Sequence, residues 1–178
     1  MSRDLRDLSA PFAAKVDALL TACRVQGVHM RPFYTLRAPA AQARLWRQSR
    51  SRAQVHAAIA GLREAGAPFL AHVLERVGPQ TGRWATNALP GLSWHQWGEA
   101  VDCFWLVDGR AEWSTRKQVD GRNGYRVYAD AAEAAGLAAG GRWRARDWPH
   151  VQMRADSSPL RTGMTLADVD AEMRARFG

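Results

Sequence analysis

Apolar side chains near the start of the chain recur at the spacing of a helix that buries one face. The stretch begins at Ser9-Ala-Pro11, a cap followed by proline near the first helical position. Gly27 is a typical helix end. The recurring apolar positions between them are Phe12, Val16, Leu19, Leu20 and Cys23. The pattern predicts a helix between Ser9 and Gly27 that packs against a core.

Strand-like runs and helical stretches follow one another through the rest of the first half. Residues 28–37 predict a strand, and Ala38-Pro39 opens the next helix with proline in its first turn. Residues 51–78 predict two helices broken near residues 66–68, and we expect this helical insertion to shape one wall of a site. Residues 78–91 are rich in Gly, Pro, Thr and Asn, which predicts a loop.

The second half contains the strongest strand signal of the chain. Residues 100–107 are rich in strand formers, and Asp108-Gly109 marks a turn into a second strand near residues 111–113. A helix is predicted within residues 124–136, and a short strand is predicted over residues 150–153. These elements predict a chain of mixed α and β structure.

The C-terminal tail, residues 156–178, is polar at first and then helical in pattern. Thr165 and Asp168 resemble a capping box, so a short helix to about Arg176 is expected. At 178 residues the chain is long enough for a proper core. We therefore expect residues 1–178 to form a single domain.

Two strands of this prediction carry polar residues where apolar ones are usual. Asp102 lies within the apolar run 100–107, and a buried carboxylate needs a partner. Because strand side chains alternate, Asp102 shares a face with Phe104, and His150 shares a face with Gln152. If the two strands lie side by side, Asp102 and His150 point into one site.

A third candidate ligand comes just before the first of these strands. His95 precedes Gly98, where the chain can turn and bring the imidazole back over the strand. Catalytic zinc needs three protein ligands of this kind and an open position for water. The spacing favours one Zn²⁺ site formed by His95, Asp102 and His150, although a single histidine is more often a surface or core residue.

The charge of the chain is strongly positive, with a formal value of +8. Such a charge attracts polyanions, among them nucleic acid and the anionic bacterial envelope. The basic residues are nearly all arginine and are spread along the chain without a nucleic-acid-binding motif, so no nucleic-acid partner is expected. No apolar run approaches the roughly 20 residues of a membrane helix, so no membrane insertion is expected.

The N-terminal residues and the cysteines indicate in which cellular compartment the protein is made and whether its thiols are reduced. The first residues mix acids with bases and lead into no apolar segment, so no secretory signal is expected and the protein should be made in the cytoplasm. Cytoplasmic thiols usually stay reduced. Cys23 and Cys103 are therefore expected to be two buried free thiols, and neither has a metal-type spacing partner.

The two polar stretches together resemble a known family. Ser-x-His-x-x-Gly-x-Ala-x-Asp at 93–102, followed by Asp-x-Pro-His at 147–150, resembles the D-alanyl-D-alanine carboxypeptidase (VanY-like) family of zinc peptidases. The resemblance implies that His95, Asp102 and His150 bind zinc and that Asp147 is the catalytic carboxylate. Many members have Glu at that position, and Asp is more similar to the phage L-alanyl-D-glutamate endopeptidase branch.

The same resemblance assigns three further residues. The family carries an Arg at a strand end and a Gln in the next helix, and Arg37 and Gln42 match that pattern. The resemblance implies that Arg37 steadies the developing oxyanion, a task that a permanently charged guanidinium can perform. We expect Gln42 to contact the substrate or a catalytic group, and Ser93 to orient a zinc ligand. Where the family usually has Arg-Ser, this chain has Arg37-Ala38, so a polar contact is missing.

The fold and function follow from the resemblance as expectations. The fold implied is α+β of the hedgehog and D,D-peptidase type, a small antiparallel sheet that carries the zinc site and is packed with helices. The activity implied is zinc-dependent hydrolysis of the L-alanyl-D-glutamate bond in peptidoglycan stem peptides. The enzyme would be a monomeric, endolysin-like protein that reaches the cell wall after holin-type release.

Two alternatives stay open at this point. One is a D-alanyl-D-alanine carboxypeptidase, which would normally be exported. The other is a non-catalytic wall-binding module that contains zinc. Structural zinc sites are normally closed by four protein ligands. The sequence offers three with a nearby carboxylate, which favours an enzyme.

Overall fold

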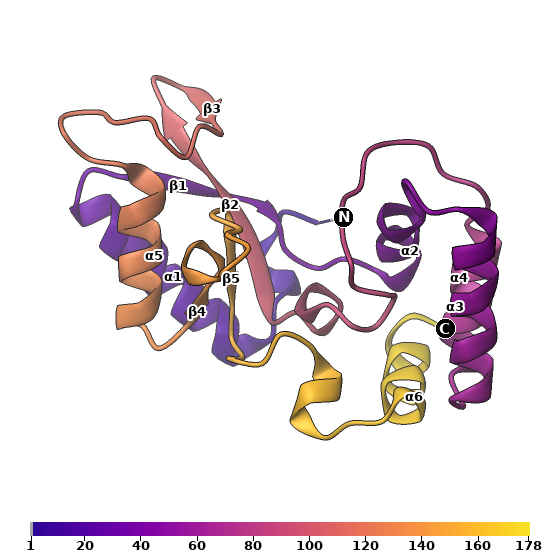
Figure 1. The fold of residues 1–178 in the computed structure, drawn as a ribbon. Helices are drawn as coiled ribbons and strands as arrows, with labels where there is room; N and C mark the ends of the chain where they lie inside the picture. Colours follow the sequence, from indigo (N-terminus) through magenta and orange to yellow (C-terminus); the bar gives the residue numbers. More distant parts are fainter. Residues whose placement is uncertain (1) are drawn as a thin grey trace. The chain divides into compact units, whose positions relative to one another are not determined.

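The computed structural model describes residues 2–178, which combine α-helices with one small antiparallel sheet (Figure 1). The predicted α+β class is confirmed. The chain divides into two compact units. The first contains the residues up to Leu36 together with Trp97–Ala155, and the second contains Arg37–Gln96 and Asp156–Gly178. The expectation of one domain over residues 1–178 stays a prediction.

The sheet lies in the first unit and is built around one long strand. The strands are β1 (His29–Tyr34), β2 (Ala100–Val107), β3 (Arg110–Glu112), β4 (Ala138–Ala139) and β5 (His150–Gln152). The order is β1-β2-β5-β4, with β3 paired to β2, and every pairing is antiparallel. β2 and β5 are neighbours, which meets the condition for Asp102 and His150 to point into one site.

Two helices of the first unit pack with the sheet to form its core. They are α1 (Ala10–Val25) and α5 (Gly124–Ala134), which pack on each other and on β1 (Figure 1). One face of β2 contributes Val101, Cys103 and Trp105 to the core. Its other face therefore carries Asp102 and Phe104 away from the core. Cys23 and Cys103 are both buried and free, as predicted.

The second unit is helical. Its helices are α2 (Pro39–Arg47), α3 (Arg52–Glu64), α4 (Pro68–Arg76) and α6 (Leu166–Phe177). The break between α3 and α4 and the capping box at the start of α6 agree with the sequence prediction. The buried carboxylate of Asp170 accepts a hydrogen bond of 2.7 Å from the Leu70 backbone N–H, which joins α6 to α4. Across residues 2–178, the longest and most apolar helices still fall short of a membrane span.

Four short 3-10 helices were not predicted. They lie at Leu5–Asp7, Trp94–Trp97, Gly140–Arg142 and Pro159–Thr162. Three or four residues complete about one turn of such a helix, so they carry no repeating apolar pattern. The strand β4 has two residues and was missed for the same reason.

The contact between α5 and the sheet provides a test of the core. A Cβ atom added at Gly124 would overlap the indole ring of the buried Trp105. Because both groups are buried, Gly124→Ala should lower the free energy of unfolding by about 1–3 kcal/mol in a denaturant titration.

Gly61 offers a matched control for this substitution. It lies within α3, and a Cβ atom added there would meet nothing within 4 Å. Gly61→Ala should leave stability unchanged or raise it by up to about 1 kcal/mol, because alanine favours the helix. Equal effects of the two substitutions would contradict the packing described here.

Candidate metal centre

The register of β2 and β5 places two of the predicted ligands opposite each other. Asp102 pairs with His150 across the antiparallel ladder, so their side chains lie on the same face. The Nδ1 atom of His150 lies 2.9 Å from Oδ1 of Asp102. Backbone pairing alone therefore brings together two residues that are far apart in the sequence.

The third candidate ligand, His95, comes from the 3-10 helix Trp94–Trp97, which leads directly into β2. Gly98 follows it with a φ of +67°, and a Cβ atom there would lie 3.1 Å from the backbone atoms Asp7 O and Ser9 N. Glycine is needed because both this backbone angle and this close approach exclude a side chain. The turn expected at Gly98 is thus present.

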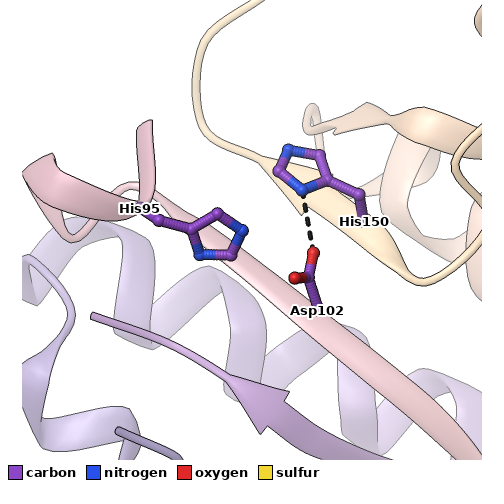
Figure 2. Close-up of side chains that lie close together, drawn as sticks. All are labelled: His95, Asp102 and His150. Atoms are coloured by element: carbon purple, nitrogen blue, oxygen red, sulfur yellow. Dashed lines mark hydrogen bonds and ion pairs between the residues drawn. The ribbon is translucent and has the colours of Figure 1, made fainter. Parts of the chain in front are cut away.

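Figure 2 shows the side chains of His95, Asp102 and His150 gathered around one point. One donor atom from each residue lies within 4.8 Å of the other two. Bonds of 2.0–2.2 Å keep any two ligands of one zinc ion within roughly 4.4 Å of each other. The observed separations, up to 4.8 Å, exceed that limit by a few tenths of an ångström, and the two imidazoles and one carboxylate are a donor set that suits zinc. The three residues therefore fit a single metal ion.

The electrostatics of His150 reflect its acidic neighbours. Burial lowers the pKa of this imidazole, but the hydrogen bond to Asp102 and the charges of Asp102 and Asp147 raise it. The hydrogen bond to Gln152 acts in the same direction, and the resulting pKa lies above the ordinary value for histidine. The acidic neighbours thus stabilise positive charge on the His150 ring.

Gln152 is a site residue to which the sequence analysis assigned no role. Its Oε1 lies 3.0 Å from Nε2 of His150, on the side of the ring opposite Asp102. Its own Nε2 donates a hydrogen bond of 2.7 Å to the Arg154 carbonyl oxygen, which fixes the amide orientation. A metal-binding histidine usually donates its second N–H to such a partner. Side chains alternate along a strand, so Gln152 lies on the same face of β5 as His150. This alternation was the sequence signal that could have identified Gln152 as a site residue.

Asp147 lies at the end of a tight loop beside this cluster. Its backbone N–H donates to the Gly140 carbonyl oxygen at 2.9 Å, and its own carbonyl accepts from the His150 N–H at 3.1 Å. Its side chain is exposed, and its charge is among those that raise the pKa of His150. The carboxylate is therefore open to solvent and near the candidate ligands.

Arg37 and Gln42 are joined by a hydrogen bond in the second unit. Nη1 of Arg37 donates to Oε1 of Gln42 at 3.0 Å, and both side chains are buried. The Arg37 backbone N–H donates to the carbonyl oxygen of His95 at 3.2 Å. This backbone contact places Arg37 next to one of the candidate ligands.

Gln96 belongs to the same network and was not identified from the sequence. Its Nε2 donates to Oε1 of Gln42 at 3.3 Å, and its Oε1 accepts from the Ser93 backbone N–H at 3.2 Å. Gln96 is fully buried and lies between His95 and the turn to β2. The one sequence signal for it was its position next to a predicted ligand. For Ser93 these contacts involve the backbone, so an orienting role for its hydroxyl stays a prediction.

A family model and solved structures are similar to this chain. Residues 5–133 match the D-alanyl-D-alanine carboxypeptidase family (VanY), a range that includes His95 and Asp102. A search of curated proteins gave no match. The crystal structure of the Serratia marcescens L-Ala D-Glu endopeptidase ChiX is similar at 19% identity, over 84% of this chain and 83% of that one, with a TM-score of 0.43. Because the family match spans most of its length, the chain belongs to the D-alanyl-D-alanine carboxypeptidase family and is a peptidase of the kind that acts on bacterial peptidoglycan.

Proposed function

We propose that the protein is a zinc-dependent peptidoglycan peptidase that hydrolyses the L-alanyl-D-glutamate bond of stem peptides. The observation that carries the proposal is the cluster of His95, Asp102 and His150, whose donor atoms lie within 4.8 Å of one another. In a chain of a peptidase family, such a cluster is best explained as a catalytic metal site.

The three ligands define what the metal would contribute. A bound zinc ion would lower the pKa of a water molecule toward 7 and polarise the carbonyl of the scissile bond. With three protein ligands, the site keeps a position for that water. Asp102 supplies one negative charge against two neutral imidazoles, so the loaded site keeps a net positive charge that favours an anionic intermediate.

Asp147 is the residue that we propose as acid and base. Its carboxylate is exposed, and its charge raises the pKa of His150, so Asp147 lies near the metal ligands. Asp147 is not itself one of the three ligands. In the proposed reaction it accepts a proton from the attacking water and then donates it to the leaving amine. These two transfers balance, because the proton lost by the water is the one that the amine gains.

Arg37 is proposed to stabilise the oxyanion that forms on the scissile carbonyl. Its guanidinium stays charged and donates in a fixed fork. Gln42 is proposed as a positioning residue, since its Oε1 holds Nη1 of Arg37 while its Nε2 donates to the Ala88 carbonyl oxygen at 2.8 Å. A guanidinium held in this way needs little rearrangement when charge develops on the substrate.

The choice of bond rests on the sequence around Asp147. Asp three residues before the last histidine resembles the phage L-alanyl-D-glutamate endopeptidases, whose route to the wall is holin-type release. The second candidate is a D-alanyl-D-alanine carboxypeptidase, which the name of the matched family favours. The formal charge of +8 would assist either enzyme at an anionic envelope surface.

Digestion of purified peptidoglycan tests the proposal and separates the two candidates. We expect new D-glutamate amino termini in the products, identified by mass spectrometry, and no release of D-alanine. A chelator should stop the reaction and added zinc should restore it, because the proposed reaction needs the metal that the three residues bind. Released D-alanine without new D-glutamate termini would contradict the proposed bond and show that the protein cleaves the D-alanyl-D-alanine bond.

Substitution of the acid and base should separate catalysis from metal binding. Asp147→Ala should abolish cleavage and retain one zinc per chain, measured by metal analysis of the purified protein, because Asp147 is outside the ligand set. The matched control is Asp17→Asn, an exposed acid on α1, which should retain activity. Turnover by Asp147→Ala close to that of the unchanged protein would remove Asp147 from this role.

Substitution of Arg37 should act on the chemical step. Arg37→Ala should lower kcat by about 10²–10³-fold, because a charged donor to the oxyanion is lost. Arg37→Lys should recover only part of this loss, since lysine keeps the charge without the fork. Arg44→Ala, at an exposed arginine of α2, is the control. A rise in KM at constant kcat would instead indicate a role in ground-state binding.

A further inference from the structure

Three aromatic rings gather on the sheet and belong neither to the core nor to the proposed catalytic groups. They are Phe33, Phe104 and Trp113, and we call them the aromatic platform. Trp113 lies with its ring centroid 4.9 Å from that of Phe33 and 5.8 Å from that of Phe104. Phe33 and Phe104 lie 6.4 Å apart in an edge-to-face arrangement. Trp113 is 45% exposed, and the two phenylalanines are half-buried.

The strand register explains why the platform forms where it does. Trp105 pairs with Glu112, so the next residue along, Trp113, comes beside Phe104. Phe33 lies at the irregularity in the β1–β2 register between Pro32 and Tyr34. All three side chains therefore come from backbone positions fixed by β2 and its two neighbours.

The platform lies on the face of the sheet that carries the metal ligands. Asp102 and Phe104 are two residues apart on β2, so their side chains share a face. The core residues Val101, Cys103 and Trp105 occupy the opposite face. Trp113 leaves this aromatic surface partly open to solvent, while the Arg3 guanidinium lies over the Phe33 ring, 5.0 Å from its centroid. Exposed apolar patches mark binding sites. Phe104 thus places the platform two residues along β2 from Asp102, on the face of the proposed catalytic site.

Distance along the strand limits what the platform could bind. Two residues of a β-strand span roughly 6.6–6.8 Å. In peptidoglycan, the L-alanine of the stem peptide is joined through a lactyl group to an N-acetylated amino sugar. The lactyl group and one alanine, each about one residue long, reach roughly 7 Å when extended. An enzyme that cuts after this alanine must therefore hold the sugar about as far from the scissile bond as Phe104 lies from Asp102 along β2.

We propose that the aromatic platform binds the N-acetylmuramic sugar ring that carries the stem peptide. The inference rests on the proposed function, because only cleavage after L-alanine brings the sugar this close. A pyranose ring presents a flat face of C–H groups, which can pack on the face of an indole as apolar groups do. For cleavage between the two D-alanines, the lactyl group and four residues would separate the sugar from the bond, roughly 16–18 Å when extended, beyond the platform.

The proposal is tested with two substrates that differ only in the sugar. One is the N-acetylmuramyl tripeptide, and the other is the same tripeptide capped by the lactyl group alone, without the sugar. For Trp113→Ala we expect kcat/KM to fall about tenfold on the first substrate, which corresponds to about 1.4 kcal/mol, and to stay unchanged on the second. Trp113→Phe should restore most of the loss, because a flat ring is kept. An equal fall on both substrates would overturn the proposal.

A control variant tests whether removing any exposed apolar side chain lowers kcat/KM. Val25, at the end of α1, is 83% exposed and lies outside the platform. Val25→Ala should leave kcat/KM unchanged on both substrates. Because Trp113 is exposed and follows the end of β3, Trp113→Ala should keep the circular dichroism spectrum and the zinc content of the unchanged protein.

A binding measurement separates this inference from the proposed function. N-acetylmuramyl-L-alanine, titrated into the zinc-loaded protein and followed by calorimetry, should bind about tenfold more weakly to Trp113→Ala than to the unchanged protein. N-lactyl-L-alanine, which lacks only the sugar, should show no such difference. If the sugar-bearing compound binds through Trp113 but the tripeptide is not cut after L-alanine, the proposed bond is wrong and the platform stands. If neither protein prefers the sugar, the platform proposal is wrong whatever bond is cut.

Discussion

The antiparallel pairing of β2 with β5 is the constraint on which the site depends. It places Asp102 opposite His150, so that two residues separated by most of the second half of the chain share one face of one sheet. A half-buried carboxylate within an apolar strand is costly unless it is paired. The hydrogen bond to His150 provides that partner within the protein. The strand can therefore carry an acidic residue that a metal cation would also stabilise.

The alternation of β2 separates the chemistry of the protein from its packing. Burial raises the pKa of the Cys103 thiol to about 12, so it remains a thiol and not a metal-binding thiolate. Asp102, its neighbour in sequence, points to the other face with the histidines. One residue of shift in the register would exchange these two roles, which makes the correct pairing of β2 essential to both stability and function.

The sequence predicted what periodicity and chemistry could signal. The helix α1 and the strand β2 have clear apolar patterns, and the three candidate ligands stand out because His and Asp are unusual in such surroundings. Gln96 and Gln152 were missed, because an uncharged amide has no distinctive spacing and its role comes only from hydrogen bonds made in three dimensions. The 3-10 helix that holds His95 is too short to leave a pattern, although Gly98 marked the turn after it.

The candidate ligands and the candidate acid and base are held in different ways, and the difference suits their tasks. His150 is fixed on both sides of its ring, by Asp102 at Nδ1 and by Gln152 at Nε2. His150 would hold a metal together with His95 and Asp102, and its contact with Gln152 would keep the orientation of its ring. Backbone hydrogen bonds hold Asp147 in its loop, while its carboxylate stays exposed. A metal ligand must not move during turnover, whereas a group that carries a proton from a water to an amine must reach two different atoms.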